Sequence, residues 1–311
     1  MSRTLFVACG WLTTLGWASD AHAFCRATTC DPSDPSQACE IVDSCVVSGE
    51  PLYWSSDCIK VGVQAAGSRL HGVGFESLME VTSQAFQAWQ AAECAGGTPS
   101  IHVQIVGPIA CNKAEYNPGA GNVSLVTFRD DDWPYMGAVD AIGRTTIRFD
   151  TETGEIWDSD IEINGTLGPI TTDGSGSAFD LASILTHEAG HALGLAHSTM
   201  FGATMIAGHS GRDVELRTLE FDDLAGICTM YPPERELAST SCEPRGGFSA
   251  ECGGYISKPP PDPVEPMLAS EEDGGCCLVA SAVHPQAGTV SWLMIIAFEL
   301  SRRRARGRHA C

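Results

Sequence analysis

HEAGHALGLAHS, residues 187–198, holds three of the nine histidines in this 311-residue chain. On an α-helix, residues four apart share a face, so His187 and His191 can direct two imidazole nitrogens at one point. Gly194 can end the helix in a left-handed conformation that a larger residue would resist, and the chain can then return His197 as a third ligand. The spacing predicts a metal site made of three histidines.

This predicted site has the features of a catalytic rather than a structural zinc centre. Three neutral nitrogens leave the fourth tetrahedral position of Zn²⁺ open to water, and the ion lowers the pKa of that water from 15.7 to about 7. Glu188 follows the first histidine and is angled toward such a water, which predicts a general base. A chance histidine-rich surface helix is the alternative, but Gly194 and His197 both fall where the geometry requires them.

The charge balance argues against a nucleic-acid partner. Between residues 24 and 288 there are 37 acidic and 12 basic residues, whereas phosphate binding needs clustered lysine and arginine. Solubility outside the cell is the simpler explanation of such an acidic surface.

Residues 1–23 have the pattern of a signal peptide, because Arg3 precedes an apolar run and Ala21 and Ala23 fit a small-residue cleavage site. Secretion is therefore expected. Ten cysteines lie between this leader and the C-terminal tail, an even number that suits five disulfides in an oxidising compartment. Their pairing does not follow from sequence, although Cys242 with Cys252 would close a short local loop.

Periodic patterns divide the rest of the chain. Residues 24–51 are cysteine-rich and aperiodic, residues 52–233 have strand and helix patterns, and residues 234–274 are a Pro- and acid-rich stretch expected to be a linker. Strands are predicted at 58–64, 100–107, 145–150 and 158–165, the last two as a hairpin around Thr153-Gly154, and helices at 75–92 and 180–193.

HEAGHALGLAHS resembles the zinc-binding signature of the metzincin peptidases, and Ser198 after the last histidine points to their matrixin branch. Met205 falls at the spacing of the methionine turn beneath the metal in that family. LEFDDLAGICTMYPP, residues 219–233, resembles the matrixin C-terminal helix, with Asp222 and Asp223 as a structural pair. Over residues 52–233 the resemblance implies an α+β fold, with a mixed twisted sheet, an active-site helix and a C-terminal helix, and one catalytic zinc.

The chain departs from the matrixin pattern at three points. Ile206-Ala207 replaces the aromatic-proline pair after the turn methionine. No histidine lies between His102 and His187, so the second, structural zinc of matrixins has no ligands. The prosegment cysteine motif is missing, so latency by the family's cysteine switch is not expected.

The C-terminal residues 275–311 combine Cys276-Cys277, the apolar run SWLMIIAFEL and an arginine cluster. This order resembles a myxobacterial-type C-terminal sorting tag, which implies transient membrane anchoring with the arginines on the cytoplasmic side. An amphipathic terminal helix with a basic end is the alternative.

Four acidic residues of the hairpin region offer a weak calcium site: Asp150, Glu152, Asp158 and Asp160. They lack EF-hand spacing, and a solvated hairpin is the simpler interpretation. His71, His102 and His209 have no partner at ligand spacing and are expected on the surface, with His209 as a candidate for lining the cleft.

These patterns together predict a secreted or cell-surface zinc endopeptidase, with a peptide or protein as substrate. By analogy with the family, substrate would lie extended against an edge strand, for which TTIRFD, residues 145–150, is the candidate. A non-catalytic zinc-containing adhesion or recognition module is the alternative, and amide hydrolysis on a cell-wall or small-molecule target is a third. Specificity and oligomeric state stay open.

Overall fold

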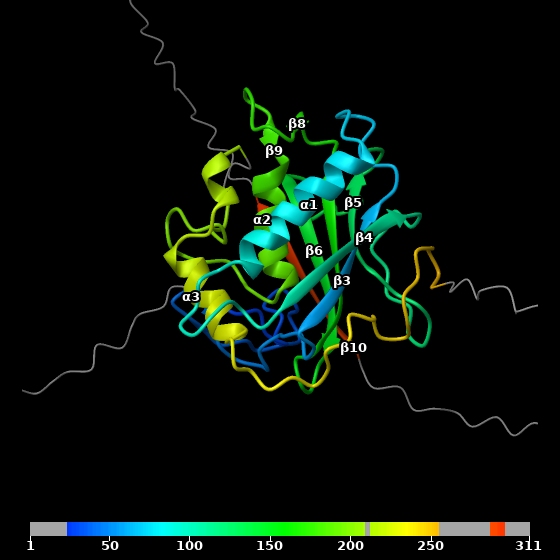
Figure 1. Ribbon diagram of the computed structural model, residues 1–311. Coiled ribbons are helices and arrows are strands. Elements are labelled where there is room, and N and C mark those ends of the chain that lie inside the picture. Colours follow the sequence, from blue (N-terminus) through cyan, green and yellow to red (C-terminus); the bar gives the residue numbers. More distant parts are fainter. Residues whose placement is uncertain (1–23, 209–211, 255–286, 296–311) are drawn as a thin grey trace, which may run out of the picture.

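A six-stranded mixed sheet forms the centre of the computed structural model, which describes residues 24–208, 212–254 and 287–295 (Figure 1). The strand order is β10-β6-β7-β5-β3-β4. The strands are β3 (Cys58–Gln64), β4 (His102–Ile109), β5 (Ser124–Arg129), β6 (Ala141–Asp150), β7 (Ile156–Asn164) and β10 (Ala287–Ile295).

Five of the six strands of this sheet run in the same direction, and only β6 runs against them. β3 pairs in parallel with β4 and β5, and β5 with β7, whereas β6 is antiparallel to β7 and to β10. The β6–β7 turn contains Gly154 at φ +77, a left-handed conformation that glycine adopts without strain. The hairpin predicted around Thr153-Gly154 is confirmed.

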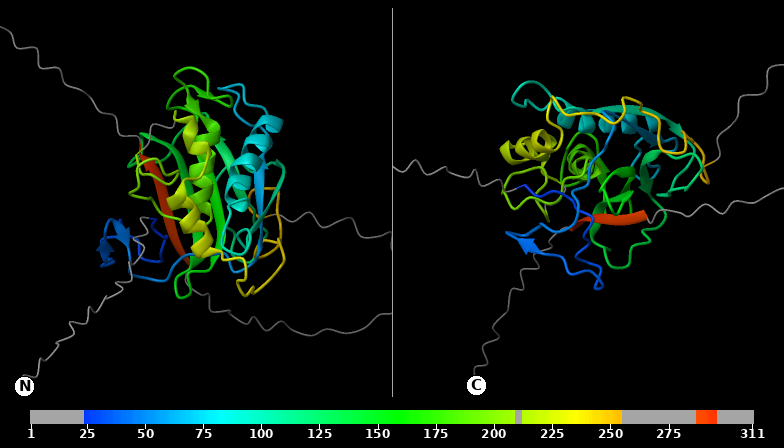
Figure 2. Two further views of the ribbon diagram at one scale, coloured as in Figure 1. Left: turned by 60° about the vertical axis from the view of Figure 1, so that its left-hand side comes forward. Right: turned by 90° about the horizontal axis from the view of Figure 1, so that it is seen from below.

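Two helices pack across one face of the sheet, and a third lies beside them (Figures 1 and 2). α1 (Phe75–Gln90) contacts β3 and β4, and α2 (Leu181–Ala192) contacts β6 and β7. The α1 side chain Trp89 is fully buried and donates its Nε1–H to the Thr186 carbonyl of α2 at 2.8 Å. With α3 (Phe221–Met230), this arrangement confirms the expected α+β fold with a mixed sheet.

The remaining elements are short. They are β1 (Ile41–Val42), β2 (Cys45–Val46), β8 (Ile170–Thr171), β9 (Phe179–Asp180) and the 3₁₀ turn η1 (Val214–Arg217). β1 and β2 form a small ribbon in the cysteine-rich segment, and β9 leads directly into α2.

The ten cysteines form five disulfides, as their even number predicted: Cys25–Cys45, Cys30–Cys39, Cys58–Cys242, Cys94–Cys228 and Cys111–Cys252. The predicted pairing of Cys242 with Cys252 is wrong. Cys242 is bonded to Cys58 at the start of β3, and Cys252 is bonded to Cys111, which follows the end of β4.

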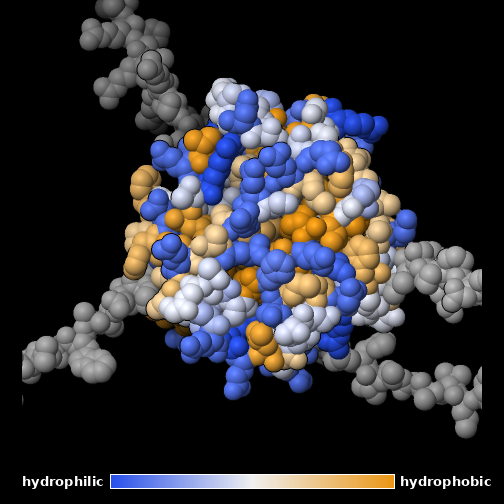
Figure 3. All heavy atoms as spheres, in the orientation of Figure 1, coloured by the Kyte–Doolittle hydropathy of each residue, from blue (hydrophilic) through white to orange (hydrophobic). Residues whose placement is uncertain are grey.

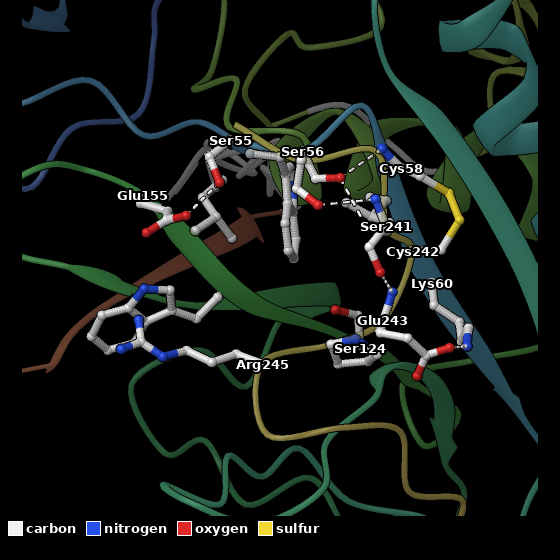
Figure 4. A pocket seen from close by; sticks show the side chains of 16 residues that line it. Ser55, Ser56, Cys58, Lys60, Ser124, Glu155, Ser241, Cys242, Glu243 and Arg245 are labelled. Carbon is white, nitrogen blue, oxygen red and sulfur yellow. Dashed lines mark hydrogen bonds and ion pairs between the residues drawn. A yellow bond between two sulfur atoms is a disulfide. The ribbon is translucent and has the colours of Figure 1, made fainter. Parts of the chain in front are cut away.

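The segment from residue 234 to residue 254 is consequently packed on the domain rather than acting as a linker. Figure 4 shows the Cys58–Cys242 disulfide and, next to it, the ion pair of Lys60 with Glu243, whose atoms are 2.5 Å apart. The Arg245 guanidinium lies over the Trp157 ring, 4.4 Å from its centroid. The linker expected from residue 234 can therefore begin only after residue 254.

The structure bears on only part of the expected leader and tail. Residues 1–23, Cys276-Cys277 and the arginine cluster lie outside the described residues. Within the described part of the chain, no helix combines the length and the apolar character needed to cross a bilayer. Residues 287–295, which include half of the apolar run, form strand β10, so the alternative of a terminal helix is wrong for them.

Candidate metal centre

The helix that carries the histidines is held at its N-terminus by an ion pair of the buried Asp180 with the partly exposed Arg217. Asp180 caps α2 by accepting a hydrogen bond from the Ser183 backbone N–H at 3.0 Å. Its carboxylate also accepts two bonds from Arg217, at 2.8 and 2.5 Å, and has no exposed surface. Burial alone would raise the pKa of Asp180, but the bonds from Arg217 and Ser183 outweigh it and lower that pKa.

The three predicted ligands meet at one place. Donor atoms of His187, His191 and His197 all lie within 4.8 Å of one another, and the Nε2 atoms of His191 and His197 are 3.2 Å apart. The first two rings lie on α2 without any exposed surface. This convergence is the geometry expected of a three-histidine metal site.

Backbone carbonyls set the tautomers of the two helical rings. Nδ1 of His187 lies 2.6 Å from the Thr204 carbonyl oxygen, and Nδ1 of His191 lies 2.9 Å from the Leu195 carbonyl oxygen. A carbonyl only accepts, so each Nδ1 carries the proton and each neutral ring keeps its lone pair on Nε2. Burial lowers the pKa of His197 to about 4, so this ring is also neutral at neutral pH. Three neutral imidazoles fit Zn²⁺ as ligands.

The chain after α2 turns at Gly194, where φ is +97. An added Cβ there would meet the Leu52 carbonyl oxygen at 2.8 Å, so the turn requires glycine. The residues leading to His197 are then held by the cysteine-rich segment: Ala27 N–H donates to the Gly194 carbonyl, and Ala196 N–H donates to the Cys25 carbonyl at 2.8 Å. This segment therefore supports the third histidine, a role that its aperiodic sequence does not suggest.

Asp222 and Asp223 fix the two loops beneath the site. Asp222 accepts a 2.5 Å hydrogen bond from the Ser198 hydroxyl, next to His197. Asp223 accepts the backbone N–H groups of Thr204 and Met205, at 2.7 and 3.0 Å. The pair thus connects α3 to the loop of the third histidine and to the methionine turn.

Met205 lies under α2 with 1% of its side chain exposed. It packs where Gly190 leaves room, since an added Cβ at Gly190 would collide with the Met205 sulfur and come within 2.6 Å of the Trp89 ring. The methionine side chain therefore packs directly against the turn of α2 that carries His187 and His191.

Glu188 has no exposed surface and is held by β6. Its Oε2 accepts a hydrogen bond from the Thr145 hydroxyl at 2.5 Å, and its Oε1 has no hydrogen-bond partner within the described residues. Burial raises the pKa of Glu188 to about 8, while the bond from Thr145 lowers it. A divalent cation on the histidines would favour the ionised carboxylate. An unpartnered buried oxygen is suited to accept a proton from a water at the site.

The sequence reading missed Thr145 as a partner of Glu188, and also missed Gly143. An added Cβ at Gly143 would lie 2.6 Å from Glu188 Oε1, so this glycine leaves room for the carboxylate. Both residues face α2 from one strand, and no local pattern in the sequence reveals such a long-range contact. Asp180 could have been found, because an Asp before an apolar helix is a typical N-cap.

The four acidic residues of the calcium hypothesis do not converge. Asp150 and Glu152 lie at the β6–β7 turn, where Asp150 accepts the Glu152 N–H at 2.8 Å, whereas Asp158 and Asp160 are buried in β7. Burial raises the pKa of Asp158, to about 7, and burial together with the neighbouring carboxylate raises the pKa of Asp160. Among the described residues, none of the four belongs to a cluster of three or more potential ligands. Calcium binding stays a prediction.

Two further histidines, His71 and His102, lie in the described part of the chain, and neither belongs to the metal centre. His71 is half-buried rather than on the surface, because its Nε2 bonds the Gly165 carbonyl at 2.9 Å and its Nδ1 accepts the Ile170 N–H. His102 is exposed, as expected, and His209 lies outside the described residues.

Two hollows lie away from the three histidines of the metal centre. A cavity of about 200 Å³ is lined by residues that include Ser55, Trp157 and Arg245 (Figure 4). A groove of about 510 Å³ runs between α1 and β4, where Figure 3 shows apolar surface, and Val103 and Ile105 line it. Neither hollow includes a residue of the metal centre.

Comparison with known proteins agrees with this geometry. The matrixin family model matches residues 113–232. The chain is 34% identical over 90 residues to metalloendoproteinase 1-MMP of Arabidopsis thaliana, and 38% identical over 66 residues to matrilysin of Rattus norvegicus. These alignments cover 29% and 21% of this chain, and only 22% and 25% of the two relatives, so the chain spans about a quarter of their length. Residues 113–232 therefore form a matrixin-like domain, and the similarities support a matrixin-like metallopeptidase.

Proposed function

We propose that the protein is a zinc-dependent endopeptidase, secreted or held at the cell surface, that cleaves peptide or protein substrates. The observation that carries this proposal is the convergence of three neutral imidazoles beside the buried carboxylate of Glu188. A zinc ion that only stabilises the fold does not require a buried carboxylate with one unpartnered oxygen next to its ligands. This argues against the adhesion or recognition module.

In this proposal His187, His191 and His197 hold one Zn²⁺, which supplies a Lewis acid and lowers the pKa of water. Glu188 takes a proton from the attacking water at Oε1 and later gives it to the leaving amine. Thr145 holds the other carboxylate oxygen, so that Oε1 keeps one orientation. Gly143 keeps the space in front of that oxygen open.

The substrate would bind as an extended strand along β6, which includes the candidate TTIRFD segment. The prediction of TTIRFD as an edge strand is wrong for this structure, because β10 pairs with the side of β6 that faces away from β7. That outer side of β6 would be the edge without β10, and Thr145 of the same strand hydrogen-bonds Glu188. Backbone pairing along such an edge positions a peptide independently of its sequence. The edge therefore suits a polypeptide better than a small molecule.

The test compares three forms of the full chain, produced through an oxidising compartment: the natural chain, Glu188→Ala and His191→Ala. We expect one zinc in the first two and little in the third, and cleavage of casein only by the natural chain. Glu76→Ala is a matched control, because Glu76 is exposed on α1. Absence of zinc from the folded natural chain would overturn the site. Zinc without cleavage, even when the β6 edge is freed as described below, would overturn the peptidase.

Secretion is a separate part of the proposal, supported by the signal-peptide pattern and by the five disulfides. The N-terminal sequence of the exported protein should begin at Phe24. A protein that keeps residues 1–23 and stays in the cell would contradict this part alone.

A further inference from the structure

β10 covers the outer edge of β6 along its whole length. Ala287 pairs with Asp150 at one end and Ile295 with Ala141 at the other, and the pairing is antiparallel. Figure 2 shows β10, in orange-red, lying along the rim of the sheet. An uncovered strand edge offers free N–H and C=O groups to any extended chain, and here a segment of the same chain has taken them.

The covered part of β6 includes the residues that contact Glu188. Trp292 pairs with Thr145, whose hydroxyl binds the Glu188 carboxylate, and Leu293 pairs with Arg144. The register shifts between Leu293 and Ile295, in the stretch that faces Gly143. The backbone of β10 therefore runs past the same strand positions at which a peptide aligned with Glu188 would have to pair.

We infer that residues 287–295 occupy the peptide-binding edge of β6. In this position they compete with the substrate and keep the enzyme latent. This inference rests on the proposed function, because it assigns the β6 edge to the substrate. It also provides a source of latency that does not depend on the cysteine motif of matrixin prosegments.

The tether makes this competition effective. Residues 255–286 connect the disulfide-held segment that ends at residue 254 to β10, and at ~3.3 Å per residue they can span about 100 Å. Because β10 belongs to the same chain, its competition is intramolecular, and its effective concentration does not fall when the protein is diluted. Loss of the tether by cleavage within residues 255–286 would convert this strong intramolecular competitor into a weak one.

The test disrupts the pairing without shortening the chain. In an antiparallel pair the N–H groups of alternate residues point to the partner, so prolines at two adjacent positions must remove one inter-strand donor. Ser291→Pro with Trp292→Pro is the test variant. Ser281→Pro with Ala282→Pro, outside β10, is the matched control with the same number of prolines.

Two measurements report on the pairing and on access. In hydrogen exchange, the β6 amides that face β10 should exchange faster in the test variant only. With casein as substrate, the test variant should cleave about tenfold faster or more, since an edge closed 90% of the time reduces apparent affinity tenfold. Equal exchange in all three chains, or equal cleavage in spite of faster exchange, would overturn the inference.

A third measurement separates this inference from the proposed function. In a Glu188→Ala background, binding of fluorescent unfolded casein should be tighter with the β10 prolines than with the control prolines, although no bond is cut. Suppose the β10 prolines tighten binding, and the same proline variant with Glu188 intact contains zinc but cleaves no casein. This result would uphold the closed edge and overturn the peptidase. Equal binding by the two proline variants would overturn the closed edge, whatever the cleavage assay shows.

Discussion

The Thr145 hydroxyl donates a 2.5 Å hydrogen bond to the Glu188 carboxylate, and the same Oγ1 lies 3.1 Å from the Glu188 backbone carbonyl oxygen, which can share its single proton. One side chain of β6 thus holds both the functional group and the backbone of the same α2 residue. The strand proposed to receive the substrate and the helix that carries the metal ligands are thereby fixed relative to one another.

Thr145→Val should reduce casein cleavage about 10–100-fold, which corresponds to ~1.4 kcal/mol per factor of ten in transition-state stabilisation. Valine keeps the shape of threonine but leaves Glu188 without its hydrogen-bond donor. Zinc content should not change, because no histidine depends on Thr145. Thr127→Val serves as the control, since Thr127 is a buried threonine of β5, outside the proposed substrate strand. A loss of zinc together with activity would show that Thr145 acts on the fold instead.

Gly190→Ala should lower the free energy of unfolding by about 1–3 kcal/mol, the usual cost of overpacking. Alanine normally favours a helix, but at this position the added Cβ would collide with Met205 and Trp89. Denaturant unfolding measures the change. Gly74→Ala is the control, because nothing lies within 4 Å of an added Cβ there and φ is −75. Equal stability of Gly190→Ala and the natural chain would show that the methionine can move aside.

Asp180→Asn should make stability less dependent on acidic pH. The pKa of Asp180 is lower in the folded protein than in the unfolded chain, so its ionised form stabilises the fold. This contribution is complete above the unfolded pKa of about 3.9 and is lost as pH falls through the lower folded value. The gap in melting temperature between the natural chain and Asp180→Asn should therefore close below about pH 4. Asp132→Asn, at an exposed position, should follow the natural chain at every pH.

Much of the fold could be predicted where the sequence carries a local signal. The β6–β7 hairpin, α1 and α2 all follow from periodicity and from turn residues such as Gly154. The three histidines were predictable as a group because helix spacing and one glycine turn bring them together over eleven residues.

The rest depends on contacts between distant parts of the chain. β5 was not predicted, since five of its six residues are buried and it shows no alternation. The partner of Cys242 is Cys58, 184 residues away, which only the folded topology reveals. The apolar run after residue 290 suits a membrane segment as well as a strand, because a short apolar stretch does not distinguish them.

Removal of zinc should destabilise the protein as well as inactivate it. A metal that binds only the folded state adds about 4 kcal/mol to its stability when free zinc exceeds the Kd a thousandfold. Dialysis against a chelator should therefore lower the melting temperature of the natural chain, and added zinc should restore it. His191→Ala should melt at the same temperature with and without zinc, whereas His102→Ala, at an exposed position, should respond like the natural chain. A zinc-dependent shift that persists in His191→Ala would place the bound metal elsewhere, because that ring is one of the three donors that meet at this centre among the described residues.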